Sequence, residues 1–236
     1  MSKAKYTFLT VFLLSYMALL GCKEGSKQNT ESMDQVGSLK FLALGDSYTI
    51  GESVAESERW PVQLAAALSQ SGVSVAPPEI IATTGWTTDE LQKGIEKAFP
   101  KPPYDLVSLL IGVNNQYRGR SLDEYKKQFE ALLVQAIDFA GGKAEKVFVV
   151  SIPDYGVTPF AADRNPEKIG KEIDAFNKAA EAISEKFGVA FVNITPGAKE
   201  AANDPELVAS DGLHPSGKMY TQWVSQILPV AKTLIK

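Results

Sequence analysis

Downstream of residue 38, the chain alternates short, continuously apolar runs with longer segments in which apolar residues recur every three or four positions. The apolar runs predict strands that are buried on both faces, as in a parallel sheet, and the longer segments predict amphipathic helices. The predicted strands cover 41–44, 79–83, 105–111, 146–152 and 189–192. Because strands and helices alternate and every crossover is long, the pattern predicts one α/β domain with a five-stranded parallel sheet.

The predicted helices carry capping and breaking signals at their ends. They cover 58–70, 88–99, 122–139, 166–187, 196–204 and the segment from 216 onward. Ser57, Thr88 and Ser121 are residue types that cap helix N-termini, and Pro61 suits a first turn. Pro229 is expected to kink or divide the last helix, because proline lacks the amide hydrogen that an interior turn needs.

Residues 1–21 predict a removable leader. Two lysines precede an apolar stretch, 6–20, which is shorter than the roughly 20 residues that a membrane span needs. The stretch ends in Leu19-Leu20-Gly21-Cys22, which resembles the bacterial lipoprotein processing box. The resemblance implies cleavage before Cys22, the only cysteine of the chain, and lipidation of that residue. The alternative is an ordinary secretory signal with an incidental cysteine.

Residues 22–38 are mostly polar and predict a flexible tether before a domain at 39–236. The leader holds two lysines and no acidic residue, so its removal changes the net charge from −4 to −6. Attachment to a membrane would therefore come from acyl chains on Cys22 and not from charge. We expect a lipid-anchored protein of the bacterial cell envelope, on a periplasmic or cell-surface face.

Composition excludes several classes of function. The net charge of −4 and the pI of about 5.2 argue against a nucleic-acid partner, which requires a basic face. His214 is the only histidine, so a site with several histidine ligands is excluded and we expect no metal. Any histidine-based proton transfer must use His214. We expect a monomer.

The first apolar run leads directly into Gly45-Asp46-Ser47-Tyr48-Thr49. Glycine adopts backbone angles that other residues avoid, so the chain is expected to turn sharply at Gly45. Ser47 then follows the carboxyl end of a strand, where open α/β sheets bind their ligands. A serine hydroxyl is a poor nucleophile unless a base takes its proton, and by itself Ser47 would be a solvated or capping residue.

Asp211 and His214 offer the base and its partner. A neutral imidazole takes a proton near neutral pH, and a carboxylate on its other nitrogen fixes the tautomer. Asp211 lies three residues before His214 in a turn that contains Gly212, so the two side chains can face each other. Taken singly, Asp211 would be a turn-capping aspartate and His214 an exposed loop histidine. Together with Ser47 they predict nucleophilic catalysis.

Acyl transfer also requires donors for the developing oxyanion. The candidates are the N–H of Ser47, the N–H of Gly85 and the side-chain amide of Asn114. Gly85 permits close backbone approach, and Gly112 allows the end of a strand to turn so that Asn114 faces the site. The alternative for Asn114 is a turn residue that bonds its own backbone.

Four segments carry a resemblance to a known family. They are Gly45-Asp46-Ser47, Gly85, Gly112-Val113-Asn114-Asn115 and Asp211-Gly212-Leu213-His214-Pro215. In this order they resemble the motif blocks of the SGNH (GDSL-like) hydrolase superfamily. The resemblance implies a flavodoxin-like three-layer α/β/α sandwich without a cofactor. It implies Ser47 as nucleophile, His214 as base, Asp211 as its partner, and an oxyanion hole from Ser47, Gly85 and Asn114.

The sequence departs from the family pattern at two positions. Tyr48 stands where the family often has leucine, and Asn115 stands where it usually has aspartate. The second change removes a carboxylate next to the predicted oxyanion hole, which bears on fine positioning and substrate preference. No Gly-x-Ser-x-Gly motif occurs, so an α/β-hydrolase nucleophile turn is not supported.

The expected function is hydrolysis of an O-acyl ester through an acyl-enzyme on Ser47. Two substrate groups are open, namely short acyl esters such as acetyl groups on glycans, and longer acyl esters or lysophospholipids. An acyltransferase with the same residues and a non-catalytic surface binding protein are the alternatives. Tyr48, Trp86, Tyr117 and Tyr155 are candidates either for lining the cleft or for packing.

Overall fold

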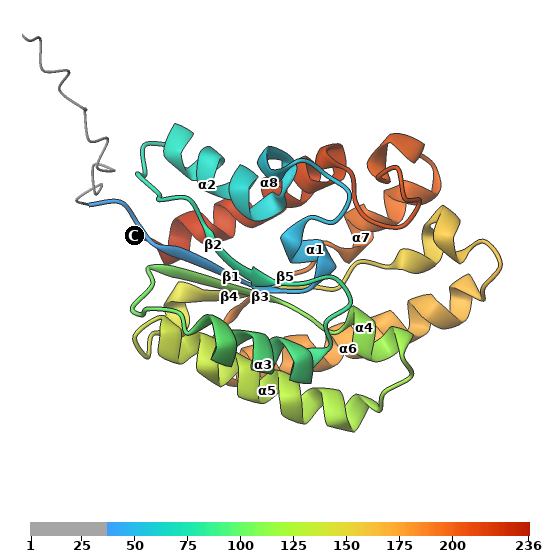
Figure 1. Cartoon of the computed structure of the whole chain (residues 1–236), viewed down its shortest axis with the longest axis horizontal. Helices are drawn as coiled ribbons and strands as arrows, with labels where there is room; N and C mark the ends of the chain where they lie inside the picture. The colour runs from blue at the N-terminus through green and yellow to red at the C-terminus, as the bar shows by residue number, and fades with distance from the viewer. Residues whose placement is uncertain (1–36) are drawn as a thin grey trace, which may run out of the picture. The chain divides into compact units, whose positions relative to one another are not determined.

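Five parallel strands form the central sheet of the computed structural model, which describes residues 37–236 (Figure 1). They are β1 Phe41–Gly45, β2 Glu79–Ala82, β3 Leu106–Leu110, β4 Val147–Val150 and β5 Ala190–Val192. Their order is β2-β1-β3-β4-β5, and every neighbouring pair is parallel. The predicted five-stranded sheet is confirmed, and each strand end lies within two residues of its expected position.

Helices cover both faces of the sheet, which confirms the α/β/α sandwich. Helices α2 (Trp60–Gln70) and α8 (Gly217–Leu234) pack together on one face. Helices α3 (Thr88–Ala98), α5 (Leu122–Phe139) and α6 (Pro166–Lys186) lie on the other (Figure 1). The strand order places β1 and β3 side by side at the centre. In an open sheet of this order, ligands bind beyond the carboxyl ends of those two strands.

The core lies between the sheet and its helices. All residues of β1, β3 and β4 are buried. Trp60 and Trp223, from the helices on one face, are fully buried. The Trp60 ring lies 6.3 Å from Phe41 of β1 and from Phe148 of β4, centroid to centroid. Large aromatic side chains therefore connect α2 to the centre of the sheet, where they contribute most to burial.

Side chains cap the N-termini of α5 and α6, and the cap of α5, Ser121, is the predicted one. Ser121 Oγ accepts the N–H of Glu124 at 3.1 Å before α5, and Asn165 Oδ1 accepts the N–H of Lys168 at 3.0 Å before α6. Pro61 occupies the first turn of α2, where its missing N–H has no intrahelical partner to lose.

Two other caps were predicted wrongly. Ser57 lies inside a short 3₁₀ helix, Glu56–Glu58, and α2 begins after Arg59. Helix α3 is capped at Thr87 and not at Thr88, because the Glu90 carboxylate accepts the Thr87 N–H at 2.9 Å. That contact is one half of a capping box, and it fixes the helix start one residue earlier.

Helix α8 continues through Pro229 without being divided. Pro229 and Ser225, whose carbonyl loses its helical partner, are both exposed. Water can satisfy that carbonyl, so the proline removes one hydrogen bond without ending the helix. Of the two predicted effects of Pro229, a kink or a division of the helix, the division was therefore wrong.

Residues 1–36 lie outside the described part of the chain, and with them the predicted leader, Cys22 and nearly all of the tether. Among the helices of residues 37–236, none is long and apolar enough to cross a membrane.

Candidate active site

A cleft of about 180 Å³ lies beyond the carboxyl ends of the central strands. Its lining residues are Ser47, Tyr48, Thr84, Gly85, Val113, Asn114, Tyr117, Tyr155, Phe160, Leu213 and His214. Four of the five predicted site residues are in this lining, and the fifth, Asp211, forms a hydrogen bond with the ring of His214. Because parallel strands end at one edge of the sheet, residues as distant as Ser47 and His214 meet there.

Ser47 is the first residue of a short helix, α1 (Ser47–Ile50), that follows β1 directly. Asp46 caps this helix, since its Oδ1 accepts the N–H of Tyr48 at 3.1 Å. Gly45 does not adopt a positive φ. A Cβ at Gly45 would lie 2.1 Å from Thr49 Oγ1 and 2.6 Å from the Leu110 carbonyl oxygen. Glycine is therefore required for close approach, and the predicted reason, an unusual backbone angle, was wrong.

The carboxyl group of Asp46 is fully buried beneath this turn. Its Oδ2 has no hydrogen-bond partner among residues 37–236. Desolvation raises the pKa of Asp46 to about 7, against the opposing effect of the backbone hydrogen bond from Tyr48. The side chain next to Ser47 is therefore partly protonated at neutral pH, because an unpaired buried carboxylate is costly.

Asp211 and His214 form the pair that the sequence predicted. The distance from His214 Nδ1 to Asp211 Oδ2 is 2.6 Å, and Asp211 Oδ1 accepts the N–H groups of Leu213 and His214 at 2.9 Å each. Desolvation raises the pKa of Asp211, but hydrogen bonds from Ser53, His214 and the backbone outweigh it and hold that pKa well below its usual range. An ionised carboxylate only accepts hydrogen bonds, so Nδ1 carries the proton and Nε2 is the free base.

Ser53 is a site residue that sequence reasoning missed. Its hydroxyl donates to Asp211 Oδ2 at 2.6 Å, across 158 positions of sequence. Ser53 has a φ of +64°, which is uncommon for a residue other than glycine. Nothing near Ser53 in the sequence indicates its partner, because the contact exists only once α1 and the Asp211 loop are side by side.

Ser47 and His214 share the cleft without touching. Among the described residues there is no hydrogen bond between the Ser47 hydroxyl and the His214 ring, although both side chains line the same volume. Such bonds are often long before substrate binds and shorten in the complex. The arrangement places a serine hydroxyl and an imidazole oriented by a carboxylate within one cavity.

Tyr48, which stands where the family often has leucine, packs against the base. Its ring is nearly buried and lies edge-on to the imidazole of His214, with ring centroids 5.7 Å apart. The other neighbour of the Tyr48 ring is Trp223 of α8, at 6.3 Å. Burial raises the pKa of Tyr48 well above its usual value, so the phenol stays neutral. Tyr48 therefore joins the His214 ring to the core.

The backbone at Ser47, Gly85 and Gly112 shapes the side of the cleft where the oxyanion donors are predicted. Gly85 has a φ of +86° and Gly112 a φ of +134°, both in the region that favours glycine. A Cβ at Gly112 would also lie 2.6 Å from the ring of Tyr125. Within residues 37–236, the N–H groups of Ser47 and Gly85 have no acceptor, so both are available to a ligand in the cleft.

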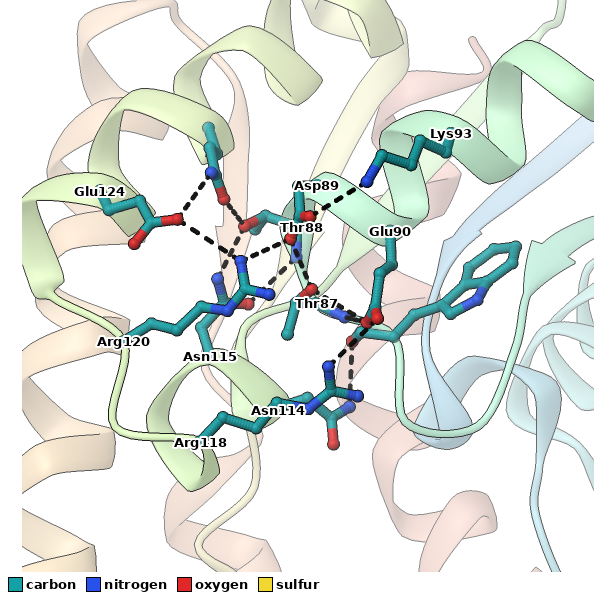
Figure 2. A network of polar contacts seen from close by, with 12 residues as sticks. Thr87, Thr88, Asp89, Glu90, Lys93, Asn114, Asn115, Arg118, Arg120 and Glu124 are labelled. Atoms are coloured by element: carbon teal, nitrogen blue, oxygen red, sulfur yellow. Dashed lines mark hydrogen bonds and ion pairs between the residues drawn. The ribbon is translucent and has the colours of Figure 1, made fainter.

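Asn114 lies in α4 (Val113–Tyr117), which follows β3. Its Nδ2 donates to the carbonyl oxygen of Trp86 at 3.0 Å (Figure 2). The alternative that Asn114 bonds its own backbone is therefore wrong. One amide hydrogen fixes the side chain against the neighbouring loop, and the second is left for the cleft that Asn114 lines. Trp86 is not a lining residue, since its ring packs on Gly94 of α3.

Asn115 does not line the cleft, and its partner is Thr88 (Figure 2). It is fully buried, its Oδ1 accepts the N–H of Thr88 at 3.1 Å, and its Nδ2 donates to Thr88 Oγ1 at 2.7 Å. The missing carboxylate was predicted to lie beside the oxyanion donors, but position 115 does not line the cleft. Position 115 ties α4 to the first turn of α3, and the amide makes both contacts.

Arg118 holds the loop that carries Gly85, because its Nη2 donates to the Gly85 carbonyl oxygen at 2.6 Å. Its Nη1 pairs with Glu90 Oε1 at 3.1 Å (Figure 2). The other oxygen of Glu90 accepts the Thr87 N–H. Hydrogen bonds from Thr87 and Arg118 lower the pKa of Glu90, against partial desolvation, so the Arg118–Glu90 pair is charged. No motif contains Arg118, and sequence reasoning missed it.

Metal coordination has no candidate in the part of the chain that the structure describes, where no three His, Cys, Asp or Glu side chains gather.

Comparisons with known proteins agree with this geometry. The family model of the GDSL-like Lipase/Acylhydrolase family matches residues 43–222. No curated protein sequence matches the chain. Among solved structures, TesA superposes with a TM-score of 0.67 at 18% identity over 83% of this chain and 99% of that one.

Two further structures superpose over 83% of this chain. The psychrotrophic esterase EstA from Pseudoalteromonas sp. has a TM-score of 0.65, 16% identity and 97% of its own chain covered. The acetylxylan esterase Axe2 from Geobacillus stearothermophilus has a TM-score of 0.61, 19% identity and 95% covered. These likenesses show the fold, and the family match spans the motif segments from Gly45-Asp46-Ser47 to His214. The chain belongs to the GDSL-like lipase/acylhydrolase family, the SGNH hydrolases, and is a carboxylic ester hydrolase.

Proposed function

We propose that the protein is a serine esterase that forms an acyl-enzyme on Ser47. The observation that carries the proposal is the oriented Asp211–His214 pair in the cleft that Ser47 lines. His214 Nε2 takes the proton of the Ser47 hydroxyl while Oγ attacks the ester carbonyl carbon. The protonated imidazole then gives this proton to the leaving alcohol oxygen as the C–O bond breaks.

Deacylation uses the same groups with water. His214 Nε2 takes a proton from water, the resulting oxygen attacks the acyl carbon, and the imidazolium returns the proton to Ser47 Oγ. The carboxylic acid leaves and the serine is restored. In both steps the negative oxygen accepts hydrogen bonds from Ser47 N–H, Gly85 N–H and the Asn114 amide.

A short acyl group fits the cleft best. Its volume of about 180 Å³ is below the roughly 300–1,000 Å³ of most small-molecule sites. Apolar and aromatic side chains form most of the walls, which suits a methyl or short alkyl group. An acetyl ester on a glycan is the favoured substrate class, and the acetylxylan esterase among the similar structures acts on that class of ester by its title. A lipid ester is the other candidate.

The test is a panel of p-nitrophenyl esters graded by acyl length, run on wild type and Ser47→Ala. We expect hydrolysis to fall as the acyl chain lengthens and to be abolished by Ser47→Ala. Ser225→Ala, which removes an exposed hydroxyl of α8, is the matched control. Absence of both turnover and labelling by a serine-reactive phosphonate would favour the non-catalytic binding protein. Higher product yield with added glycerol or sugar acceptors would identify an acyltransferase.

We also propose that the protein is anchored to a membrane of the bacterial cell envelope through lipidated Cys22. The support is the basic start, the apolar stretch and the processing box in the sequence. Intact-mass measurement of the expressed protein and of Cys22→Ala tests this. The wild type is expected to carry acyl mass that the variant lacks, and equal masses after leader removal would contradict it.

A further inference from the structure

Three aromatic rings gather on one wall of the cleft. Tyr117, Tyr155 and Phe160 all line it, and their ring centroids lie 6.1 to 6.4 Å apart in each pairing. Tyr155 is buried, whereas Tyr117 is 46% exposed and Phe160 is 38% exposed. Large side chains of this kind are usually covered, so their exposure at the mouth of a ligand cleft indicates a contact surface.

Arg164 is held against these rings. Its guanidinium carbon lies 5.0 Å from the centroid of Tyr117 and 4.8 Å from that of Phe160. Its Nη2 donates to the hydroxyl of Tyr117 at 3.1 Å. Cation–π contacts of this length favour one side-chain position, so little rotamer entropy is left to lose when a ligand binds.

Arg164 has no carboxylate partner among residues 37–236, although Arg118 and Arg120 are paired with Glu90 and Asp89. The cleft lining likewise contains no acidic side chain. The chain as a whole has a net charge of −4. Arg164 is therefore a cation without an ion-pair partner in the described part of the chain, held on two of the rings that line the cleft.

Phe160 connects this wall to the base side, whereas Tyr117 belongs to α4, the helix of Asn114. The N–H of Phe160 donates to the carbonyl oxygen of Gly212 at 2.9 Å, and Gly212 belongs to the turn between Asp211 and His214. In the proposed mechanism, His214 protonates the leaving alcohol oxygen, so the alcohol portion of the ester must lie next to this turn. The Phe160 end of the aromatic wall is accordingly next to the alcohol portion.

We propose that Arg164, together with Tyr117 and Phe160, forms a subsite for a carboxylate group on the alcohol portion of the ester. A guanidinium matches a carboxylate with two parallel hydrogen bonds, and the rings cover the apolar part of the same group. The inference rests on the proposed esterase function and specifies its substrate as an acidic one. The competing explanation is that Arg164 only braces the aromatic rings.

The experiment compares two acetyl esters of nearly equal size, 3-acetoxybenzoate and 3-acetoxybenzamide, each normalised to its rate with hydroxide. The measured quantity is the ratio of kcat/KM for the anionic over the neutral ester. Wild type is expected to favour the anionic ester by up to about fivefold, the upper end of the contribution of an exposed ion pair. The preference is expected to appear in KM. It should decrease in 1 M salt, because the short Debye length at that concentration screens exposed charges.

Arg164→Gln is expected to reduce the ratio to about one, and Arg164→Lys to keep part of it. Lys168→Gln is the matched control, since it removes a cation four residues away that already faces Glu172. A ratio near one in wild type overturns the subsite. So does a loss in Arg164→Gln that affects both esters equally, which is the result expected of a brace.

The test separates this inference from the proposed function. If neither ester is hydrolysed and Ser47 is not labelled by a phosphonate, the esterase proposal fails. The subsite is then decided by calorimetric titration of wild type and Arg164→Gln with 3-hydroxybenzoate and 3-hydroxybenzamide, which requires no turnover. Tighter binding of the benzoate to wild type alone supports the subsite, and equal binding overturns it.

Discussion

The two sides of Ser47 are held in different ways. On the oxyanion side, the Gly85 loop and α4 are joined by hydrogen bonds and ion pairs, with Arg118 on the Gly85 carbonyl and Asn114 on the Trp86 carbonyl. On the base side, His214 has one side-chain hydrogen bond, to Asp211, and is otherwise packed by apolar and aromatic groups such as Tyr48. Hydrogen bonds and ion pairs between loops fix the first side, whereas apolar and aromatic packing around the His214 ring fixes much of the second.

The difference follows from what each side must hold. An oxyanion donor such as the Gly85 N–H is part of the backbone, and its direction depends on how the whole peptide is oriented. Hydrogen bonds on the neighbouring carbonyls fix that orientation directly. An imidazole needs only its ring plane and its tautomer fixed, and one carboxylate with close packing does both. The ion pairs on the oxyanion side are partly exposed and contribute only roughly 0–1 kcal/mol each, so their main effect is on geometry.

Breaking the hydrogen bond between the His214 ring and Asp211 should have the largest effect. Asp211→Asn is expected to lower kcat by roughly 10⁴-fold, because an amide can stabilise the tautomer that places the proton on Nε2. The measurement is kcat on a short acyl ester, with Asp204→Asn, an exposed acid paired with Lys218, as the control. Activity within tenfold of wild type would show that His214 does not depend on Asp211.

On the oxyanion side, Asn114→Ala is expected to cost about 2.7–4 kcal/mol of transition-state stabilisation, seen as a lower kcat with little change in KM. Asn115→Ala is the informative contrast, since Asn115 bonds Thr88 and does not line the cleft. It should lower the free energy of unfolding more than it lowers kcat. A rate change below tenfold for Asn114→Ala would remove that amide from the oxyanion hole.

Beneath both sides, Asp46 makes stability depend on pH. Its pKa is raised to about 7 in the folded protein from 3.8, so between these values the folded state binds more protons than the unfolded state. The free energy of unfolding therefore falls as pH rises from about 4 to 7. Asp46→Asn should remove this fall. Between pH 4 and pH 8, the variant should therefore lose on the order of 3 kcal/mol less unfolding free energy than wild type.

Urea unfolding of wild type and Asp46→Asn at pH 4.5, 6 and 8 measures this difference. The result that contradicts the interpretation is a stability difference between the two proteins that is the same at all three pH values.

The smallest effect should come from loosening the Gly85 loop. Arg118→Met removes the donor to the Gly85 carbonyl and is expected to lower kcat about tenfold, with KM nearly unchanged, because a misdirected peptide weakens only the transition-state contact. Arg118→Lys should recover part of the rate. Arg120→Met is the control, since Arg120 pairs with Asp89 in the same network without touching Gly85. If Arg118→Met and Arg120→Met lower kcat equally, the network stabilises the fold and does not specifically orient the Gly85 peptide.

The sequence by itself determined the sheet, most of the helices and the residues of the site. Strand and helix periods are local patterns, so the five strands could be placed to within two residues. Ser47, Gly85, Asn114 and His214 were predicted to share a site because each follows a strand or occupies a motif, and they line one cleft because parallel strands bring such positions to one edge. Local signals failed where a nearby carboxylate competed, as Glu90 did for the cap of α3.

Only the tertiary structure decided which residues support these groups. Ser53 meets Asp211 across 158 positions, and Arg118 meets Gly85 across 33. Tyr48 packs on His214, whereas Asn115 bonds Thr88 and does not line the cleft. These contacts join loops that follow different strands, and their distances depend on how the strands are ordered. A pattern of neighbouring residues contains no such information, because side-chain contacts between loops form only after the sheet has assembled.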